Sequence, residues 1–130
     1  MINNNVLDMI GNTPMIKLNN IGNSNIYVKL EKYNLAGSIK DRAVYYMVEN
    51  LEKNGLLKKG DVLVEATSGN TGIALSMIGS LKGYKVIIVM PETMSIERRT
   101  LMKAYGAKFI LTDGSLGMKG SIEKMNKLFK

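Results

Sequence analysis

The sequence contains no cysteine and no histidine. Without cysteine, the chain itself can supply no disulfide, no thiolate nucleophile and no cysteine zinc site. Without histidine, it also lacks the commonest general base and the commonest transition-metal ligand. We therefore predict no metal site, and we expect any proton transfer to depend on lysine, aspartate, glutamate, tyrosine or a bound cofactor.

Long apolar runs are missing as well. No run approaches the roughly 18 residues that a membrane span requires. The first residues include Asn3, Asn4 and Asn5 in place of a basic segment followed by an apolar stretch. The content of 45% hydrophobic and 22% charged residues is typical of a soluble globular domain. We accordingly expect a cytoplasmic protein without a membrane partner.

The positive charges are dispersed along the chain. The formal net charge is +7, but lysines and arginines form no run longer than a pair, and aromatic residues are not interleaved with them as in a single-strand binder. A dispersed lysine surface usually serves solubility. This pattern favours a small anionic ligand over a nucleic acid.

Short apolar runs alternate with helical patterns over most of the chain. Ser95 is a predicted helix N-cap, and Gly55, Gly83 and Gly106 are predicted to end helices. Alternation of this kind predicts an α/β fold, a mostly parallel sheet with flanking helices and right-handed crossovers. The predicted strands lie at 26–30, 62–66, 86–90 and 109–111, and the two clearest helical patterns lie at 39–51 and 73–81.

One candidate site follows the predicted strand at 62–66. In parallel α/β sheets, ligands collect at the carboxyl ends of strands, where helix N-termini direct NH groups and partial positive charge at anions. Hydroxyls, a carboxamide and glycine in this loop suit a carboxylate or a phosphate, and a turn capped by its own side chains is the alternative. The loop matches neither a Walker A loop nor the G-x-G-x-x-G fingerprint. The candidate residues are Thr67, Ser68, Gly69, Asn70 and Thr71.

Lys40 is the second candidate. Ser38 and Asp41, three residues apart, form a variant of the capping box, which places Lys40 in the first turn of a helix. The positive end of a helix disfavours an ammonium group, so the lysine is driven towards the neutral amine that can attack an aldehyde. The alternative is a lysine that simply extends into solvent.

Both candidates lie within a larger set of motifs. Five blocks resemble, in order, the motifs of cysteine synthases and cystathionine beta-synthases, which are fold-type-II pyridoxal-phosphate enzymes. One such block would only be suggestive, whereas five in register along nearly the whole chain are specific to that family. The blocks span 10–18, 31–42, 65–72, 90–99 and 105–107, with a weaker sixth at 117–118.

The resemblance implies a role for each candidate residue. Lys40 would hold pyridoxal 5'-phosphate as a Schiff base and would act as the acid-base group once substrate displaces it. Asn70 would donate a hydrogen bond to the 3'-oxygen of the cofactor. The absence of histidine agrees with such an enzyme, because the cofactor is the electron sink and a lysine moves the proton. The loop expected to close on the amino-acid carboxylate consists of Thr67, Ser68, Gly69, Asn70 and Thr71.

The implied reaction is beta-replacement or beta-elimination on O-acetylserine, serine or cysteine. The wording of the blocks at 31–42 and 90–99 favours a cysteine synthase, which converts O-acetylserine and sulfide to cysteine and acetate, over a serine or threonine dehydratase. A hydrogen-sulfide-producing cysteine beta-lyase and a cystathionine- or lanthionine-forming beta-synthase are the alternatives. The resemblance also implies a homodimer, and a thiol in place of sulfide for some of these reactions.

The chain departs from the family in two respects. Leu35 stands where a proline usually follows asparagine, which removes a rigid constraint from the loop before Lys40. Family members are also more than twice as long, and the absent half is expected to supply the glycine-rich loop for the cofactor phosphate. Residues 114–120 are interpreted as a helix-opening connection rather than a substitute for that loop. We expect a truncated, inactive chain that self-associates through its exposed surface.

The resemblance divides the chain into two parts. Residues 1–35 are expected to belong to an incomplete large domain, and residues 36–130 to form a small α/β domain that carries Lys40 and the substrate loop. The last helical pattern begins near Gly120 or Ser121 and reaches Lys130 without a cap, so the fold is expected to continue. Two other classes of function stay open: a non-catalytic interaction protein that retains the small-domain fold, and a nucleotide-binding α/β domain.

Overall fold

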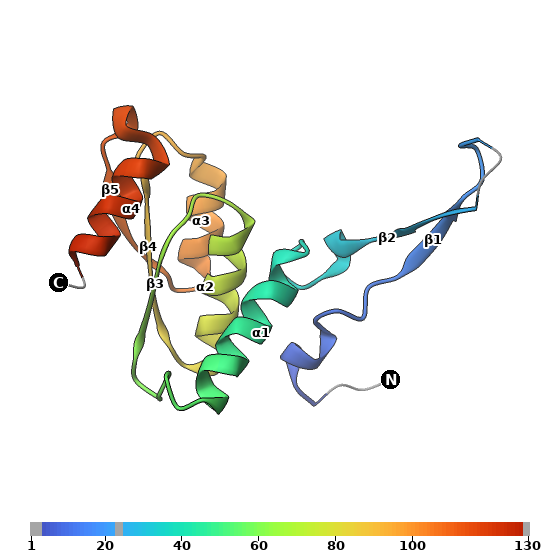
Figure 1. Ribbon diagram of the computed structural model, residues 1–130, viewed down its shortest axis with the longest axis horizontal. Coiled ribbons are helices and arrows are strands. Elements are labelled where there is room, and N and C mark those ends of the chain that lie inside the picture. Colours follow the sequence, from blue (N-terminus) through green and yellow to red (C-terminus); the bar gives the residue numbers. More distant parts are fainter. Residues whose placement is uncertain (1–3, 23–24, 129–130) are drawn as a thin grey trace.

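The structure is a computed structural model that describes residues 4–22 and 25–128 (Figure 1). An N-terminal segment leads into a region in which strands and helices alternate. The elements in chain order are η1 (Val6–Met9), β1 (Met15–Leu18), β2 (Ile26–Lys29), η2 (Glu31–Tyr33), α1 (Lys40–Lys53), β3 (Val62–Ala66), α2 (Asn70–Lys82), β4 (Lys85–Pro91), α3 (Ile96–Ala104), β5 (Lys108–Thr112), η3 (Gly114–Leu116) and α4 (Gly117–Lys127).

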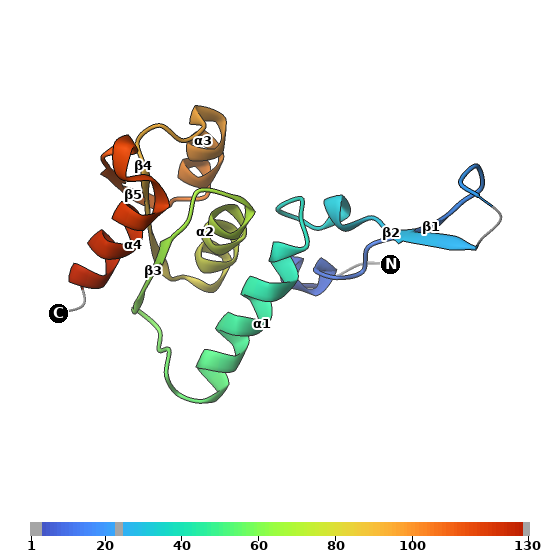
Figure 2. The same ribbon diagram turned by 45° about the horizontal axis from the view of Figure 1, so that its top comes forward.

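A parallel sheet of β3, β4 and β5 forms the centre of the alternating region, with β4 in the middle. α4 covers one face of this sheet, while α2 and α3 lie on the other (Figures 1 and 2). α1 packs against α2 and forms the outer edge of that side. This arrangement confirms the predicted α/β fold with a mostly parallel sheet and flanking helices.

The core lies between β4 and α2. Every residue from 72 to 79 in α2 is buried, and Ile88, Val89 and Met90 of β4 have no exposed surface. A strand between two helical layers must be apolar on both faces, which explains the continuous apolar run in the sequence. Burial at about 25 cal/mol per Å² of apolar surface makes this sandwich the main source of stability.

The N-terminal segment extends away from these layers (Figure 1). β1 and β2 pair in antiparallel fashion, with Ile16 opposite Val28, and form a projecting hairpin. Large apolar side chains on it remain in solvent, including Met15 at 60% and Tyr27 at 59% exposure. The sequence predicts β2 but not β1, although both strands are four residues long and neither contains a buried residue.

α1 confirms the helical pattern predicted at 39–51, but little of its apolar surface is covered. Of the apolar positions in this pattern, only Val44 and Val48 are buried, whereas Ile39 and Met47 are more than half exposed. The apolar stripe of α1 is therefore wider than α2 can cover.

The predicted start of the last helix is wrong. α4 begins at Gly117 rather than near Gly120, because η3 passes directly into the helix. Of residues 114–120, only 114–116 form the helix-opening connection, and 117–120 are the first turn of α4. α4 ends at Lys127, and the expected continuation to position 130 lies outside the described residues. None of the helices that the structure describes is long and apolar enough to cross a membrane.

Candidate active site

The two candidate segments begin neighbouring helices. Lys40 is the first residue of α1, and Asn70 is the first residue of α2. The two helices contact each other, and both begin at the end of the domain where β3 finishes (Figure 1). α2 therefore begins at the carboxyl end of β3, where ligands of parallel α/β proteins bind, and packing against α2 brings the start of α1 to the same end.

Lys40 has its backbone fixed and its amine available. Its amide N–H donates to Ser38 Oγ at 3.1 Å, and its side chain is exposed. In the part of the chain that the structure describes, its amine makes no hydrogen bond or ion pair. This combination suits a lysine that must react with an aldehyde, because no internal partner has to be displaced first.

The predicted capping box is not formed. Ser38 accepts from the residue two positions later rather than three, and Asp41 Oδ2 accepts from the amide of Ala36 at 2.6 Å rather than from Ser38. The N-cap residue Ile39 is already in the right-handed helical region, so the chain enters α1 through a tighter turn than a capping box requires. The expectation that Lys40 lies in the first turn is nevertheless confirmed.

Asp41 is fully buried directly after Lys40. One carboxylate oxygen holds the Ala36 amide, and the other has no hydrogen-bond partner among the described residues. Burial raises the pKa of Asp41, although backbone hydrogen bonds, the first of them from Ala36, partly offset this effect. The Asp41 carboxylate thus anchors the loop before Lys40, although its buried position disfavours a negative charge.

Of the loop predicted at 67–71, residues 67–69 precede α2, whereas Asn70 and Thr71 lie in its first turn. The loop is held by its backbone. The Thr67 amide donates to Val89 O at 3.1 Å, which extends the pairing of β3 with β4. Gly69 is the N-cap of α2, and its carbonyl accepts from the amides of Gly72 and Ile73. No side chain caps α2, so the alternative of a turn capped by its own hydroxyls is wrong. The helix start is left with NH groups that an anion could bind.

Gly72 allows the loop to pack closely on the helix. A Cβ atom at this position would lie 2.9 Å from Thr67 Cγ2 and 3.1 Å from the Met102 sulfur. Gly69, in contrast, has no atom within 4 Å of the position a Cβ would occupy, so its surroundings are open. On the outer side, the Ser68 carbonyl accepts from Arg98 Nη1 at 3.5 Å.

Sequence reasoning missed a set of polar residues next to Lys40. The Arg42 guanidinium donates to both carboxylate oxygens of Glu31, at 2.8 and 3.0 Å, and Thr13 Oγ1 donates to the same carboxylate at 2.7 Å. Hydrogen bonds from Arg42 are the main reason that the pKa of Glu31 falls to about 2. The same pairing raises the pKa of Arg42. These residues lie inside the motif blocks at 10–18 and 31–42, and membership of these blocks was the one indication in the sequence that they belong to the site.

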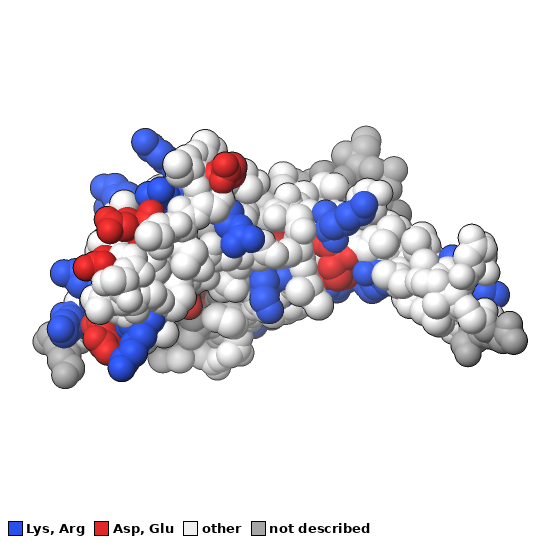
Figure 3. Space-filling model, turned by 90° about the horizontal axis from the view of Figure 1, so that it is seen from above, with Lys and Arg blue, Asp and Glu red and all other residues white. Residues whose placement is uncertain are grey.

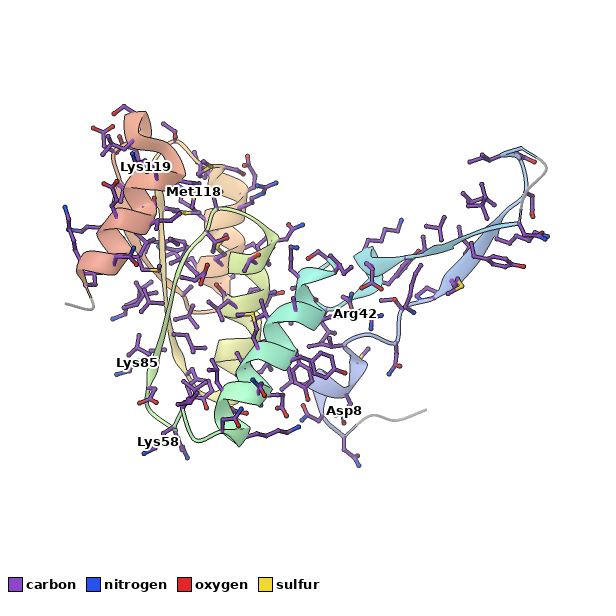
Figure 4. All side chains as sticks on the ribbon, viewed as in Figure 1. Asp8, Arg42, Lys58, Lys85, Met118 and Lys119 are labelled. Atoms are coloured by element: carbon purple, nitrogen blue, oxygen red, sulfur yellow. The ribbon has the colours of Figure 1, made fainter. Side chains whose placement is uncertain are left out.

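The surface around these elements carries both signs of charge. On the face seen from above, basic and acidic side chains alternate over the strand and helix layers, and neither forms a continuous stripe (Figure 3). Among the labelled charged side chains, Arg42 comes from α1 where this helix meets the N-terminal segment, and Asp8 comes from η1 (Figure 4).

Comparison with known proteins places this geometry in context. The chain is 57% identical over 126 residues to a cysteine synthase of a Flavobacterium strain, covering 95% of this chain and 41% of that protein. Among solved structures, a hydrogen sulfide-producing enzyme from Fusobacterium nucleatum is 55% identical, with a TM-score of 0.92 over 99% of this chain and 43% of that one. A cysteine synthase from Entamoeba histolytica is 46% identical, with a TM-score of 0.94 over 99% of this chain and 40% of that one.

The chain therefore spans about two fifths of the length of the relatives it matches. The family described as pyridoxal-phosphate dependent enzymes matches residues 6–130, which include both helix starts and the hairpin. The resemblance read from the five motif blocks is confirmed by these similarities, and the chain belongs to the family of pyridoxal-phosphate dependent enzymes.

Proposed function

We propose that this chain supplies the reactive lysine and the amino-acid-binding loop of a cysteine synthase. The protein would catalyse beta-replacement on O-acetylserine, with sulfide as the nucleophile. The observation that carries the proposal is the shared edge at which α1 and α2 begin, with Lys40 first in one helix and Asn70 first in the other. Similarity to cysteine synthases at 57% identity supports the same reaction class.

The residues present suit the pyridoxal-phosphate cofactor of the family. Lys40 offers an exposed amine without an internal partner among the described residues, and Asn70 offers an exposed carboxamide. When bound, pyridoxal phosphate would supply an electron sink for the bond that breaks at the substrate α-carbon. Lys40 would hold the cofactor covalently and, once released, would take and return the proton at that carbon.

The loop would hold the carboxylate of the amino acid. The amides at the uncapped start of α2 and the hydroxyls of Thr67, Ser68 and Thr71 are the donors available for this role. The open space at Gly69 would let the loop approach the ligand. Attraction between the negative carboxylate of the amino acid and the partial positive charge at the start of α2 would then favour one orientation of the substrate.

We further propose that residues 1–35 belong to a larger domain and that residues 36–130 form the small domain. The exposed apolar side chains of the hairpin and of α1 support this division, because surfaces of this kind are normally covered. By the same argument the isolated chain would self-associate, and the whole protein would be a homodimer. The chain alone would also lack the residues that bind the cofactor phosphate, so it would be inactive.

Hydrogen sulfide production is a second candidate. It is favoured by the similarity to the Fusobacterium nucleatum enzyme, at 55% identity. The two functions share the proton transfer at Lys40. They differ in the sulfur chemistry: sulfide adds to the substrate in cysteine synthesis, whereas the sulfur of cysteine leaves as sulfide in hydrogen sulfide production. Assays with O-acetylserine plus sulfide, and with cysteine alone, separate them in the whole protein.

Covalent labelling tests the role of Lys40. The chain is incubated with pyridoxal phosphate, reduced with sodium borohydride, digested, and mapped by mass spectrometry. Lys53 is the internal control, because its side chain is 76% exposed and it has only a 4.0 Å pairing with Glu49. We expect label at Lys40 well above that at Lys53. Equal labelling would show that exposure alone explains the reactivity and would overturn the assignment.

Turnover by the isolated chain tests its inactivity. We expect no cysteine above background from O-acetylserine and sulfide with added pyridoxal phosphate, because positioning by both halves of a site supplies much of the rate. The Lys40→Ala chain provides the matched background. Cysteine formation that depends on Lys40 would contradict the proposed inactivity while supporting the proposed reaction.

A further inference from the structure

Arg42 connects the first turn of α1 to the N-terminal segment. Its Nη2 donates to Gly11 O at 2.6 Å, and its guanidinium grips the Glu31 carboxylate with two hydrogen bonds. Figure 4 shows Arg42 extending from α1 towards the segment that carries η1 and β1. A two-point contact of this kind fixes direction as well as distance, because the planar guanidinium matches the planar carboxylate.

Glu31 and Asn34 continue the connection to the loop before Lys40. The Asn34 amide group donates to Glu31 Oε2 at 2.9 Å and to the Ser38 carbonyl at 3.0 Å, while its oxygen accepts from the Gly11 amide at 2.9 Å. Asn34 is 4% exposed, so these bonds are shielded from competing water. Ser38 in turn accepts from the Lys40 amide. Hydrogen bonds therefore link Arg42 through Glu31 and Asn34 to the Ser38 carbonyl, and the Ser38 hydroxyl links the same residue to the backbone of Lys40.

Gly11 shows how closely Arg42 is seated. It has a φ of +93°, and a Cβ atom there would lie 2.6 Å from Arg42 Nη1 and 3.2 Å from Cζ. Any larger residue would have to displace the guanidinium from Glu31 as well as adopt an unfavourable backbone conformation. Close packing of the Arg42 guanidinium on the backbone therefore requires glycine at position 11, which is 31 residues away in the sequence.

Arg42 cannot act on the Lys40 amine directly. Residues two apart on a helix point to different sides, so the two side chains do not face each other. The influence of Arg42 must pass through the backbone of the first turn and through the loop that ends at Ser38.

We propose that Arg42 is a positioning residue, which with Glu31, Asn34 and Gly11 fixes the first turn of α1 so that Lys40 presents its amine in one orientation. We call these four residues the Arg42 clasp. The inference rests on the proposed function of Lys40 and adds a role for residues outside the cofactor and substrate contacts. A displacement of about 1 Å at such a lysine can cost up to about 100-fold in rate.

The test compares the initial rate of borohydride-trapped labelling at Lys40 in three forms of the chain. Condensation of the amine with the pyridoxal-phosphate aldehyde releases water, and borohydride supplies the hydride that makes the bond permanent. Arg42→Lys keeps the charge but loses the two-point grip, and Gly11→Ala displaces the guanidinium without altering Arg42. We expect each to lower the rate at Lys40 about tenfold, with the rate at Lys53 unchanged.

Lys82→Met is the matched control for a general loss of stability. Lys82 ties the other end of α1 to α2 through Glu49 and Glu52, and its removal weakens the same helix without touching the clasp. All variants are compared at a temperature where circular dichroism shows them folded. Equal slowing by Lys82→Met and Arg42→Lys would mean that Arg42 acts only through stability, and would overturn the proposal.

Amide hydrogen exchange gives a readout without cofactor. In Arg42→Lys the Gly11 and Lys40 amides should exchange faster than in the unmodified chain, whereas amides in the middle of α2 should not. Unchanged exchange at both amides would overturn the clasp. Failure of the unmodified chain to label Lys40 selectively would instead overturn the proposed function, so the two failures are distinguishable.

Discussion

The ammonium of Lys82 on α2 lies 2.8 Å from Oε2 of Glu52 on α1. It also pairs with Glu49, and the Tyr84 hydroxyl donates to Oε1 of Glu52 at 2.8 Å. The Lys82 side chain is only 14% exposed, so water screens this group less than an ordinary surface ion pair. Burial acts against its charge, yet hydrogen bonds to the two carboxylates raise the pKa of Lys82 overall.

Lys82→Met should lower the free energy of unfolding by about 2 kcal/mol, between the values typical of exposed and buried pairs. The loss arises because Glu49 and Glu52 of α1 would then lie close together without the ammonium that pairs with both. Urea unfolding at pH 7 measures the effect. Lys53→Met is the control, since this exposed lysine lies 4.0 Å from Glu49 and should contribute no more than about 0.5 kcal/mol. Equal losses in the two variants would contradict the prediction.

Glu31 should make the chain more sensitive to acid. Hydrogen bonds from Arg42, and then from Thr13, lower its pKa from 4.5 to about 2 in the folded chain. A carboxyl with a lowered folded pKa stabilises the fold fully above its ordinary pKa, and this stabilisation is lost as the pH falls from about 4.5 towards 2. Glu31→Gln removes the titrating group.

Urea unfolding between pH 6 and pH 2 tests this prediction. The unmodified chain should lose more stability over that range than Glu31→Gln does. The Glu97→Gln chain is a useful control because Glu97 is exposed on α3 and, among the described residues, hydrogen bonds from Ser95 and its own backbone rather than a cation lower its pKa. Parallel curves for Glu31→Gln and the unmodified chain would show that the Arg42 pairing is absent in solution.

Asp41 should have the opposite pH dependence. Burial raises its pKa, so the folded chain binds a proton there more readily than the unfolded chain. The cost of the buried charge is present at neutral pH and disappears as the pH falls through the raised folded pKa towards the ordinary value of 3.8. Acidification should therefore shift the stability difference between the unmodified chain and Asp41→Asn in favour of the unmodified chain.

The same unfolding series, with Asp41→Asn added, measures this shift. Because the effects of Asp41 and Glu31 have opposite signs over overlapping pH ranges, they partly cancel in the unmodified chain. The single variants separate them. A constant difference between Asp41→Asn and the unmodified chain from pH 7 to pH 4 would mean that Asp41 titrates normally.

Local signals predicted β4 and α2 because these elements bury most of their apolar residues. β4 and α2 were readable from continuous apolar patterns, and the glycine after α2, Gly83, ends it with a φ of +80° as expected. The exposed faces of α1 and the hairpin were not readable. Periodicity reports that a stripe such as the one with Ile39 and Met47 is apolar, but not whether a neighbouring element covers it.

Position along one helix was predictable for Lys40, which opens α1 as the capping residues around it indicated. Asn70 was assigned to a loop but is the first residue of α2. The detailed cap was not predictable, since it depends on the backbone angles of Ile39. The Arg42 clasp was missed because its partners Glu31 and Gly11 are 11 and 31 residues away, and no local pattern reports a contact over that separation.

Gly79 offers a test of how tightly α2 packs on the sheet. A Cβ atom at this position would overlap Cγ2 of Val86, which is 4% exposed in β4. Alanine gains up to about 1 kcal/mol in a helix over glycine. Overpacking in a close-packed core typically costs about 1–3 kcal/mol, so we expect Gly79→Ala to be net destabilising in urea unfolding.

Ser80→Ala separates the two contributions to that result. Ser80 follows Gly79 in α2 but is exposed, so the substitution improves helix propensity without adding a contact in the core. It should leave the chain as stable or slightly more stable. If Gly79→Ala and Ser80→Ala change the free energy of unfolding equally, then α2 lies farther from β4 than the structure places it. The packing of α2 on the sheet, which also positions the start of α2 beside β3, would then be looser.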